Sequence, residues 1–221
     1  MAKNYIQKGC KLSWLNSTGA AIVSGIAIIF GFIGMAIALD AIAISGTGVV
    51  SMEGVWAMAK ATGAISQGDR LWWSPATEDV TNSPSLNSYF IGYATESALS
   101  ADATVNVLLE EFGNEGPRVL TLAATGNQTI GAGDFMSGDL TLLVPNTGAK
   151  TLALPAVATI PTGAKLTVKK TDATAAAITL DPNASETIAG SATYASQDAN
   201  NDYAQFINNG TAWILLNAVI A

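Results

Sequence analysis

GAAIVSGIAIIFGFIGMAIAL, residues 19–39, decides the fold of this 221-residue chain, because it holds no charged residue and two interpretations compete for it. An apolar run longer than about 18 residues is typical of a transmembrane helix. Lys3, Lys8 and Lys11 precede the run, as basic residues precede a membrane anchor. A membrane-anchored surface protein is therefore one interpretation.

Three features of the same run favour β-strands. Glycine divides it into pieces of about strand length, at Gly19, Gly25, Gly31 and Gly34. Its pieces are rich in isoleucine and valine, which favour strands. Large side chains alternate with alanine at its end, where Met35, Ile37 and Leu39 flank Ala36 and Ala38. A period of two belongs to a sheet, so we expect strands here.

Short apolar stretches separated by turn residues follow the run. We expect strands over 49–60 with a break at Gly54, over 70–73 after a Gly68-Asp69 turn, over 89–94 and over 104–109. Strands of this length predict an all-β domain, a small barrel or sandwich, over residues 1–112. Trp56, Trp72 and Trp73 could form an adhesive surface, but packing in the core or a subunit interface is the commoner role of aromatic residues in strands.

The composition favours large buried interfaces. Apolar residues make up 49% of the chain and charged residues 12%, about half the usual share. Outside a membrane, such an apolar surplus belongs in subunit interfaces, and we expect a homotrimer. The net charge of −7 argues against a nucleic-acid partner, which needs a cationic face.

No catalytic constellation is visible. The chain has no histidine and a single cysteine, Cys10, which excludes imidazole-based triads, imidazole metal sites and an internal disulfide. Glu110 and Glu111 are neighbours in an extended stretch and point to opposite faces. Asp198 and Asp202 lie in a polar loop that could hold a cation, although solvated loops of this kind are common. We expect no enzyme activity, no cofactor and no metal.

A second β domain is predicted after a linker. Residues 113–118, GNEGPR, have the glycine, proline and charge of a linker, and residues 119–221 read as a β-sandwich-like domain. Asn209-Gly210 predicts a two-residue hairpin turn with positive φ at both residues, joining a strand that ends at Ile207 to one through Trp213. We expect Trp213 to pack inward; the alternative is an exposed platform for glycans.

The first half resembles a family of phage capsid decoration, or cement, proteins. The likeness rests on the opening MAKNYIQKG (1–9), on 24–36, on Glu53-Gly54-Val55-Trp56, on QGDRLWW (67–73) and on Ile91-Gly92-Tyr93-Ala94. It covers about residues 1–112 and implies that this domain binds the outer surface of a capsid and stabilises it. We expect the capsid or subunit interface to include Tyr5, Ile6, Ile26, Ile28, Met35, Ile37, Trp56, Trp72 and Trp73.

The second half is similar to β domains of phage head fibres and tail fibres, through stretches such as Leu152-Ala153-Leu154-Pro155 and Asn209 to Trp213. This likeness implies an exposed module that binds a host cell-surface glycan or protein. The expected partners are thus the major capsid protein, further copies of the chain and a host surface, and the expected location is the outside of the virion capsid. A tail-fibre or baseplate adhesin and a membrane-anchored protein remain the alternatives.

Overall fold

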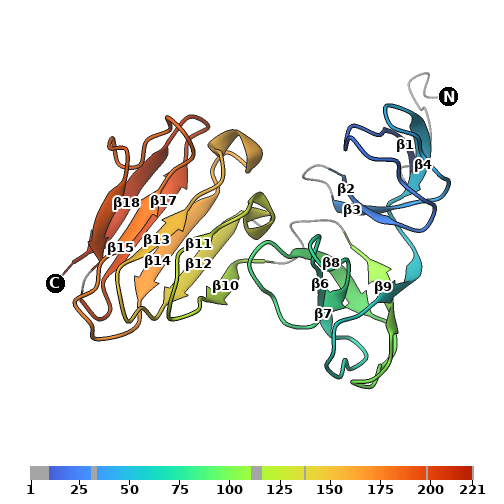
Figure 1. Ribbon diagram of the computed structural model, residues 1–221, viewed down its shortest axis with the longest axis horizontal. Helices are drawn as coiled ribbons and strands as arrows, with labels where there is room; N and C mark the ends of the chain where they lie inside the picture. The colour runs from blue at the N-terminus through green and yellow to red at the C-terminus, as the bar shows by residue number, and fades with distance from the viewer. Residues whose placement is uncertain (1–9, 31–33, 111–115, 137, 198, 221) are drawn as a thin grey trace, which may run out of the picture. The chain divides into compact units, whose positions relative to one another are not determined.

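The protein is built from β-strands. The computed structural model describes residues 10–30, 34–110, 116–136, 138–197 and 199–220, and every regular element in them is a strand apart from two short 3-10 helices (Figure 1). The predicted all-β fold is therefore confirmed. The chain divides into two compact units, the first made of residues 1–83 and 90–112 and the second of residues 84–89 and 113–221.

The first unit contains two antiparallel sheets with the same strand topology. The first sheet has the order β1-β4-β3-β2, with β1 Lys11–Leu15, β2 Ala27–Phe30, β3 Gly34–Ala38 and β4 Thr47–Ser51. The second has the order β5-β9-β8-β6-β7, with β5 Val55–Ala59, β6 Arg70–Trp73, β7 Val80–Thr81, β8 Tyr89–Ala94 and β9 Thr104–Leu109. Apart from the added β7, the second sheet repeats the order of the first. We call β1–β4 with their loops the first repeat and β5–β9 with theirs the second repeat.

The loops of the two repeats are also equivalent. In the first repeat Ile22 and Ile42 exchange main-chain hydrogen bonds, and in the second Ile65 and Ala98 do the same. The turn glycine that follows donates its N–H to the end of the third strand in each case, Gly25 to Ala38 and Gly68 to Ala94, both at 2.8 Å. An internal duplication therefore underlies the first unit.

The uncharged run supplies the interior of the first repeat. It contains β2 and β3, and all five residues of β3 are buried. Ile28, Ala36 and Ala38 form a core cluster with Ile42 and Val50. No helix in the described residues is both long enough and apolar enough to span a bilayer.

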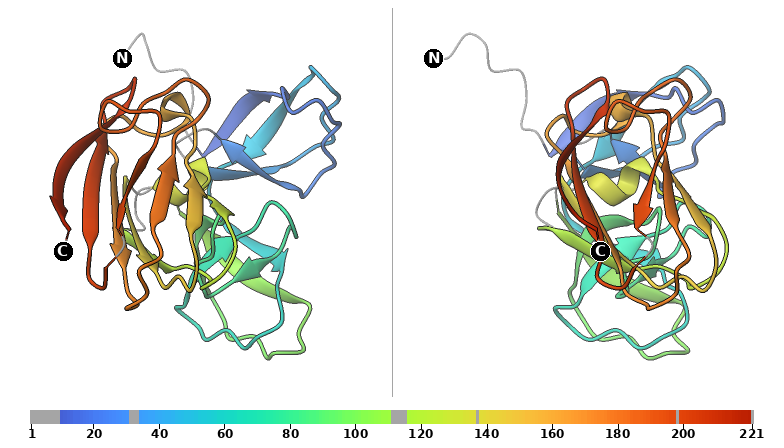
Figure 2. Two further views of the ribbon diagram at one scale, coloured as in Figure 1. Left: turned by 60° about the vertical axis from the view of Figure 1, so that its left-hand side comes forward. Right: turned by 90° about the vertical axis from the view of Figure 1, so that its left-hand side faces the viewer.

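The second unit consists of two sheets that face each other across one core (Figures 1 and 2). One sheet has the order β10-β12-β14-β17-β18, with β10 Arg118–Thr121, β12 Asp139–Val144, β14 Lys165–Lys170, β17 Tyr203–Asn208 and β18 Trp213–Val219. The other has the order β11-β13-β15-β16, with β11 Gln128–Thr129, β13 Lys150–Ala153, β15 Ile178–Asp181 and β16 Tyr194–Gln197. The 3-10 helices are η1, Ala132–Phe135, and η2, Val157–Thr159.

The chain winds through these two sheets as a short solenoid. It alternates between them three times, so β10, β12 and β14 pair in parallel in one sheet and β11, β13 and β15 in the other. Leu120, Leu142 and Val168 stack in register and are buried, as solenoid side chains are on successive turns. Antiparallel strands β16–β18 complete the two sheets. A second β domain was predicted, but the parallel pairing of its strands is a finding of the structure alone.

The predicted hairpin is present, but its turn differs from the prediction. Strands β17 and β18 are antiparallel, with Asn208 opposite Trp213, so the loop has four residues, Asn209–Ala212. Only Gly210 has positive φ, at +95°; the prediction of positive φ at Asn209 was wrong. The Asn209 side chain instead accepts hydrogen bonds from the N–H groups of Thr211 and Ala212, which shapes a wider loop. Trp213 is fully buried beside Phe135, which confirms that it packs inward.

The segment predicted as a linker ends inside the second unit. Residues 111–115 lie outside the described residues, while Arg118 opens β10 and is only 2% exposed. Residues 84–89 also belong to this unit, although in the sequence they lie between the two segments of the first unit.

The equivalence of the repeats predicts equal costs at their turn glycines. Gly25 and Gly68 both have φ of +86°, and an added Cβ would meet nothing within 4 Å, so backbone strain alone acts. We expect Gly25→Ala and Gly68→Ala each to lower the free energy of unfolding by about 1–2 kcal/mol, measured by urea denaturation. Gly148→Ala, in open space without positive φ, is the control and stays near wild type. A loss at only one of the two turn glycines would contradict the equivalence.

Candidate functional site

Buried polar side chains hold the loops of the first unit at one end of each repeat. In the first repeat Asn16 is fully buried, and its side-chain NH2 group donates hydrogen bonds to the carbonyls of Ala20, Ile42 and Ala43, at 2.7, 3.3 and 3.2 Å. Its Oδ1 accepts a hydrogen bond from the N–H of Thr18. Asn16 thereby ties the loop before β2 to the loop before β4.

Lys60 performs this task in the second repeat. The main-chain N–H groups of Asn16 and Lys60 make equivalent hydrogen bonds, to Gly46 and to Ala103. The buried Lys60 ammonium donates to the carbonyls of Ala61, Ser100 and Asp102, at 3.1, 3.3 and 3.2 Å. An amide and an ammonium thus supply the donors that inward-facing loop carbonyls require.

The loops held by Asn16 carry exposed apolar side chains. Leu15, Val23 and Ile44 are 58%, 60% and 58% exposed, and we call these three residues the loop surface. Their equivalents in the second repeat are exposed Ala59, Ser66 and Ser100, although that repeat has an exposed apolar residue of its own, Leu99, directly before Ser100. Because the same loop fold forms with small or polar residues there, folding does not require the apolar side chains of the loop surface. Clustered exposed apolar residues mark interaction sites.

A comparison with protein families finds a match in this region. Residues 6–109 match the phage cement protein family. The match covers both repeats and just under half of the chain, and it implies a structural role in decorating and stabilising a phage capsid, within the virion. No curated protein matches the chain. We call residues 6–109 the cement region.

Most of the predicted interface residues lie inside the cement region. Tyr5 and Ile6 lie outside the described residues. Five of the predicted residues are only 1–7% exposed and belong to the interior of the unit: Ile28, Met35, Ile37, Trp72 and Trp73. Ile26 and Trp56 are half-buried and therefore partly accessible to a partner, and an interface role stays a prediction for all of the named residues. Burial followed from the strand pattern, whereas Val23 and Ile44 of the loop surface lie between strands, where the alternation that we used carries no signal, and Leu15 is the last residue of β1.

A signal for the duplication is nevertheless present in the cement region. Ile22-Val23-Ser24-Gly25 and Ile65-Ser66-Gln67-Gly68 share the spacing Ile-x-x-Gly, and both glycines have the same positive φ. Aligning these two stretches would have placed Val23 opposite Ser66 and exposed the difference between the repeats.

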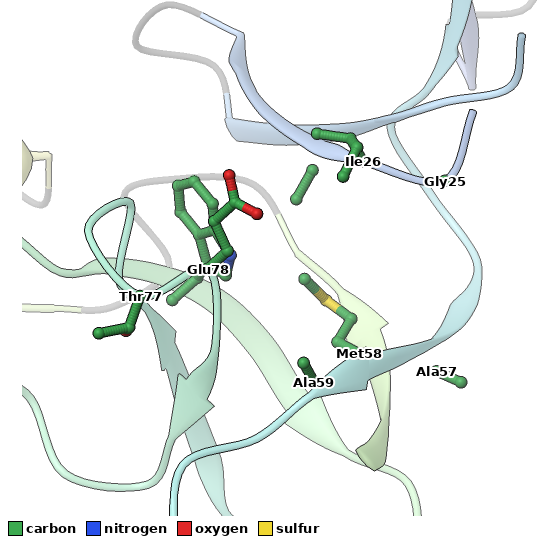
Figure 3. Close-up of a pocket in the computed structure, with 9 residues that line it drawn as sticks. Gly25, Ile26, Ala57, Met58, Ala59, Thr77 and Glu78 are labelled. Carbon is green, nitrogen blue, oxygen red and sulfur yellow. The ribbon is translucent and has the colours of Figure 1, made fainter. Parts of the chain in front are cut away.

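A pocket of about 340 Å³ lies between the two repeats of the cement region (Figure 3). Its lining is Gly25, Ile26, Ala27, Ala57, Met58, Ala59, Trp73, Thr77 and Glu78. Glu78 directs a carboxylate toward the pocket, and the Thr77 hydroxyl donates to Asp79 instead. A single carboxylate beside small apolar residues does not form a recognisable set of catalytic groups or ligands.

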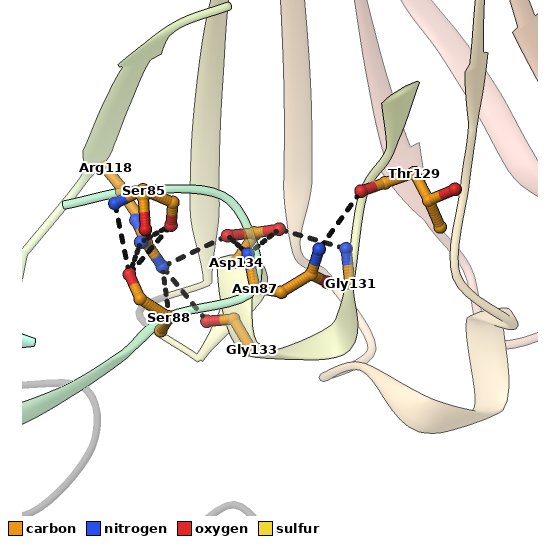
Figure 4. Close-up of polar contacts among 8 residues, drawn as sticks. All are labelled: Ser85, Asn87, Ser88, Arg118, Thr129, Gly131, Gly133 and Asp134. Atoms are coloured by element: carbon orange, nitrogen blue, oxygen red, sulfur yellow. Dashed lines mark hydrogen bonds and ion pairs between the residues drawn. The ribbon is translucent and has the colours of Figure 1, made fainter. Parts of the chain in front are cut away.

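The second unit contains a buried ion pair at the start of its solenoid (Figure 4). Arg118 and Asp134 lie 3.3 Å apart, with side chains 1% and 0% exposed. Arg118 also donates to the carbonyls of Ser85 and Ser88, and Asp134 accepts from the N–H groups of Asn87 and Gly131. The pair therefore fastens residues 84–89 to the first turn of the solenoid, and its hydrogen bonds serve structure.

The side chain of Lys170, at the end of β14, places a buried ammonium among the loops that follow β12 and β14. The fully buried Lys170 donates to the Asn146 side chain at 2.5 Å, to Asp172 at 2.9 Å and to Thr174 at 3.2 Å. These three acceptors match the three donors of an ammonium group. Burial raises the pKa of Asp172, but hydrogen bonds from the Asn146 N–H, from Thr174 and from Lys170 outweigh it and hold that pKa well below its usual range.

The predicted cation loop is only partly described. Position 198 lies outside the described residues, and Asp202 is buried and accepts a hydrogen bond from the N–H of Ala199 in its own loop. Within the described ranges, no group of three or more Cys, Asp or Glu side chains is placed to hold a metal ion.

Removing the charge of Asp134 should destabilise the second unit strongly. Asp134→Asn leaves the Arg118 guanidinium buried without its counter-ion, which costs about 3–5 kcal/mol. Asp139→Asn is the matched control, because Asp139 pairs with Lys165 at 3.8 Å with both side chains nearly half exposed. We expect that variant to lose less than about 1 kcal/mol. Urea denaturation measures both, and equal losses would contradict a structural role for the buried pair.

The pKa of Asp172 predicts an acid-sensitive second unit. Because the folded-state pKa lies below the ordinary value of 3.8, this carboxylate stabilises the fold above that pH, and the contribution is lost as the pH falls further. We expect the melting temperature of the wild type to fall more steeply below pH 4 than that of Asp172→Asn. Asp139→Asn serves as the control and follows the wild-type profile; parallel profiles for wild type and Asp172→Asn would refute the assignment.

Proposed function

We propose that the protein is a homotrimeric decoration protein that binds the outer surface of a phage capsid through its cement region and stabilises the shell. The observation that carries this proposal is the loop surface: Leu15, Val23 and Ile44 are exposed in the first repeat where the second repeat has Ala59, Ser66 and Ser100. The family match supports a capsid as the partner, and the major capsid protein is the partner within it that we propose.

The size of the loop surface explains why several copies must act together. Burying the exposed part of one such apolar side chain contributes about 1–1.5 kcal/mol. Three of them give only a few kcal/mol per copy, which does not offset the cost of association by a wide margin. In a trimer the second and third contacts become intramolecular, so avidity converts weak contacts into stable attachment.

The second unit is, in this proposal, displayed on the outside of the capsid, where it contacts a host glycan or protein. Two observations support a binding role over a catalytic one. The ion pair of Arg118 with Asp134 is buried, and the Lys170 ammonium has each of its hydrogen bonds within the unit. The outer face of β14 carries the half-buried polar residues Lys165, Thr167 and Lys169, of which Lys165 also pairs with Asp139 and Thr167 accepts a hydrogen bond from Gln205.

A charge placed on the loop surface tests capsid binding. Ile44→Asp would bring a carboxylate into the apolar contact, so we expect at least a tenfold weaker affinity for undecorated shells, measured by cosedimentation. Ser100→Asp, at the equivalent exposed position of the second repeat, is the matched control and leaves the affinity unchanged. Circular dichroism checks that both variants are folded.

Two results would overturn the proposal. If Ile44→Asp binds shells as wild type does, the loop surface is not the contact. If the wild-type protein binds host cells but no shell, the protein is an adhesin of the tail fibre or baseplate, the alternative that the second half of the sequence left open.

A further inference from the structure

Strand β18 exposes most of its apolar side chains. It is the last strand of its sheet in the described part of the chain, and Ile214, Leu215, Leu216, Val219 and the following Ile220 are 37–52% exposed. Residues 203–221 include no charged residue and no proline. Lysine and proline are the usual means by which a protein prevents an edge strand from pairing with another chain.

The chain covers only the beginning of this edge. Trp213 donates its N–H to the carbonyl of Thr187 at 2.9 Å, and its carbonyl accepts from the N–H of Ala189 at 2.8 Å. Beyond Trp213, none of the described residues forms a β-bridge with the outer edge of β18. Strand β18 has a bulge opposite Gln205 and Phe206, so its outer edge is irregular. A partner would therefore contact the apolar side chains of β18 more than its main-chain hydrogen-bonding groups.

The opposite end of the same sheet is treated differently. Residues 84–89 lie at β10, where Arg118 donates to Ser85 and Ser88, and Leu86 packs against the core of the unit. One exposed apolar residue, Val119, is found on β10, whereas β18 carries four and Ile220 follows them. The unit therefore covers one end of its sheet with its own chain and leaves the other end apolar.

We propose that copies of this chain associate with one another along β18. A residue near a symmetry axis meets its own copy, so a charged residue there would meet a like charge. The segment 203–221 satisfies this condition over its whole length, since all its residues are uncharged. The half-buried Ile207 of β17 lies directly opposite Ile214 of β18 and extends the apolar face of the contact.

This assignment rests on the homotrimer of the proposed function and names the surface that forms it. It also separates two contacts by unit: the cement region binds the capsid through the loop surface, and the second unit binds its own copies through β18. A decoration protein built in this way would trimerise without the shell and then attach to it.

The experiment compares charged variants of the two ends of the sheet in the full chain. Analytical ultracentrifugation of the wild type should give a trimer at micromolar concentration. Leu216→Lys and Val219→Lys should sediment as monomers, because three ammonium groups would meet at the axis, while Val119→Lys on β10 should remain trimeric. Tryptophan fluorescence and circular dichroism check that each variant is folded.

Cysteine crosslinking gives a second readout that does not depend on dissociation. In a Cys10→Ser background, Val219→Cys should form disulfide-linked pairs under mild copper oxidation, and Val119→Cys should not. A wild-type trimer that persists in both lysine variants, without crosslinks at Val219, overturns the β18 contact but leaves the trimer of the proposed function. A wild-type monomer overturns both, and binding to shells by the Val119→Lys protein tests the capsid contact separately.

Discussion

Inward-facing main-chain groups of long loops are the constraint on which this structure depends. Strands of two to six residues leave much of the first unit in loops, and the carbonyls of buried loops need hydrogen-bond donors. Asn16 supplies them in one repeat and Lys60 in the other, through different chemistry at equivalent positions. Arg118 does the same for Ser85 and Ser88 in the second unit. Each of these side chains positions loops that strand pairing alone would leave undefined.

The duplication separates what the fold needs from what the function needs. Features common to both repeats, such as the paired loops at Ile22 and Ile65 and the turns at Gly25 and Gly68, maintain the fold. Features of one repeat alone are free to serve recognition, and the exposed Val23 and Ile44 are of this kind. A protein that must present a surface to a shell can therefore change its loops without changing its core.

The second unit resolves a different problem, because the first and last turns of a solenoid each leave a strand edge without a neighbouring turn to pair with. Residues 84–89 lie at the β10 end, fastened by the ion pair of Arg118 and Asp134. Antiparallel strands β17 and β18 form the other end, where, among the described residues, the outer edge of β18 is hydrogen-bonded at Trp213 by Thr187 and Ala189. The unequal treatment of the two ends is the basis on which we propose that one of them is a contact surface.

By itself the sequence determined the strands: the glycine-divided run at 19–39, the break at Gly54, the turn before Arg70 and the inward Trp213 follow from side-chain periodicity and glycine placement, which are local properties. Only the tertiary structure decided which strands pair, since Leu142 lies beside Leu120 and Val168 through contacts between distant residues that periodicity does not encode. It also decided which apolar residues are exposed. Met35 and Val23 are both apolar residues of one run, yet the first is buried in a strand and the second lies 60% exposed in a loop held by Asn16, because burial depends on neighbours supplied by the rest of the fold.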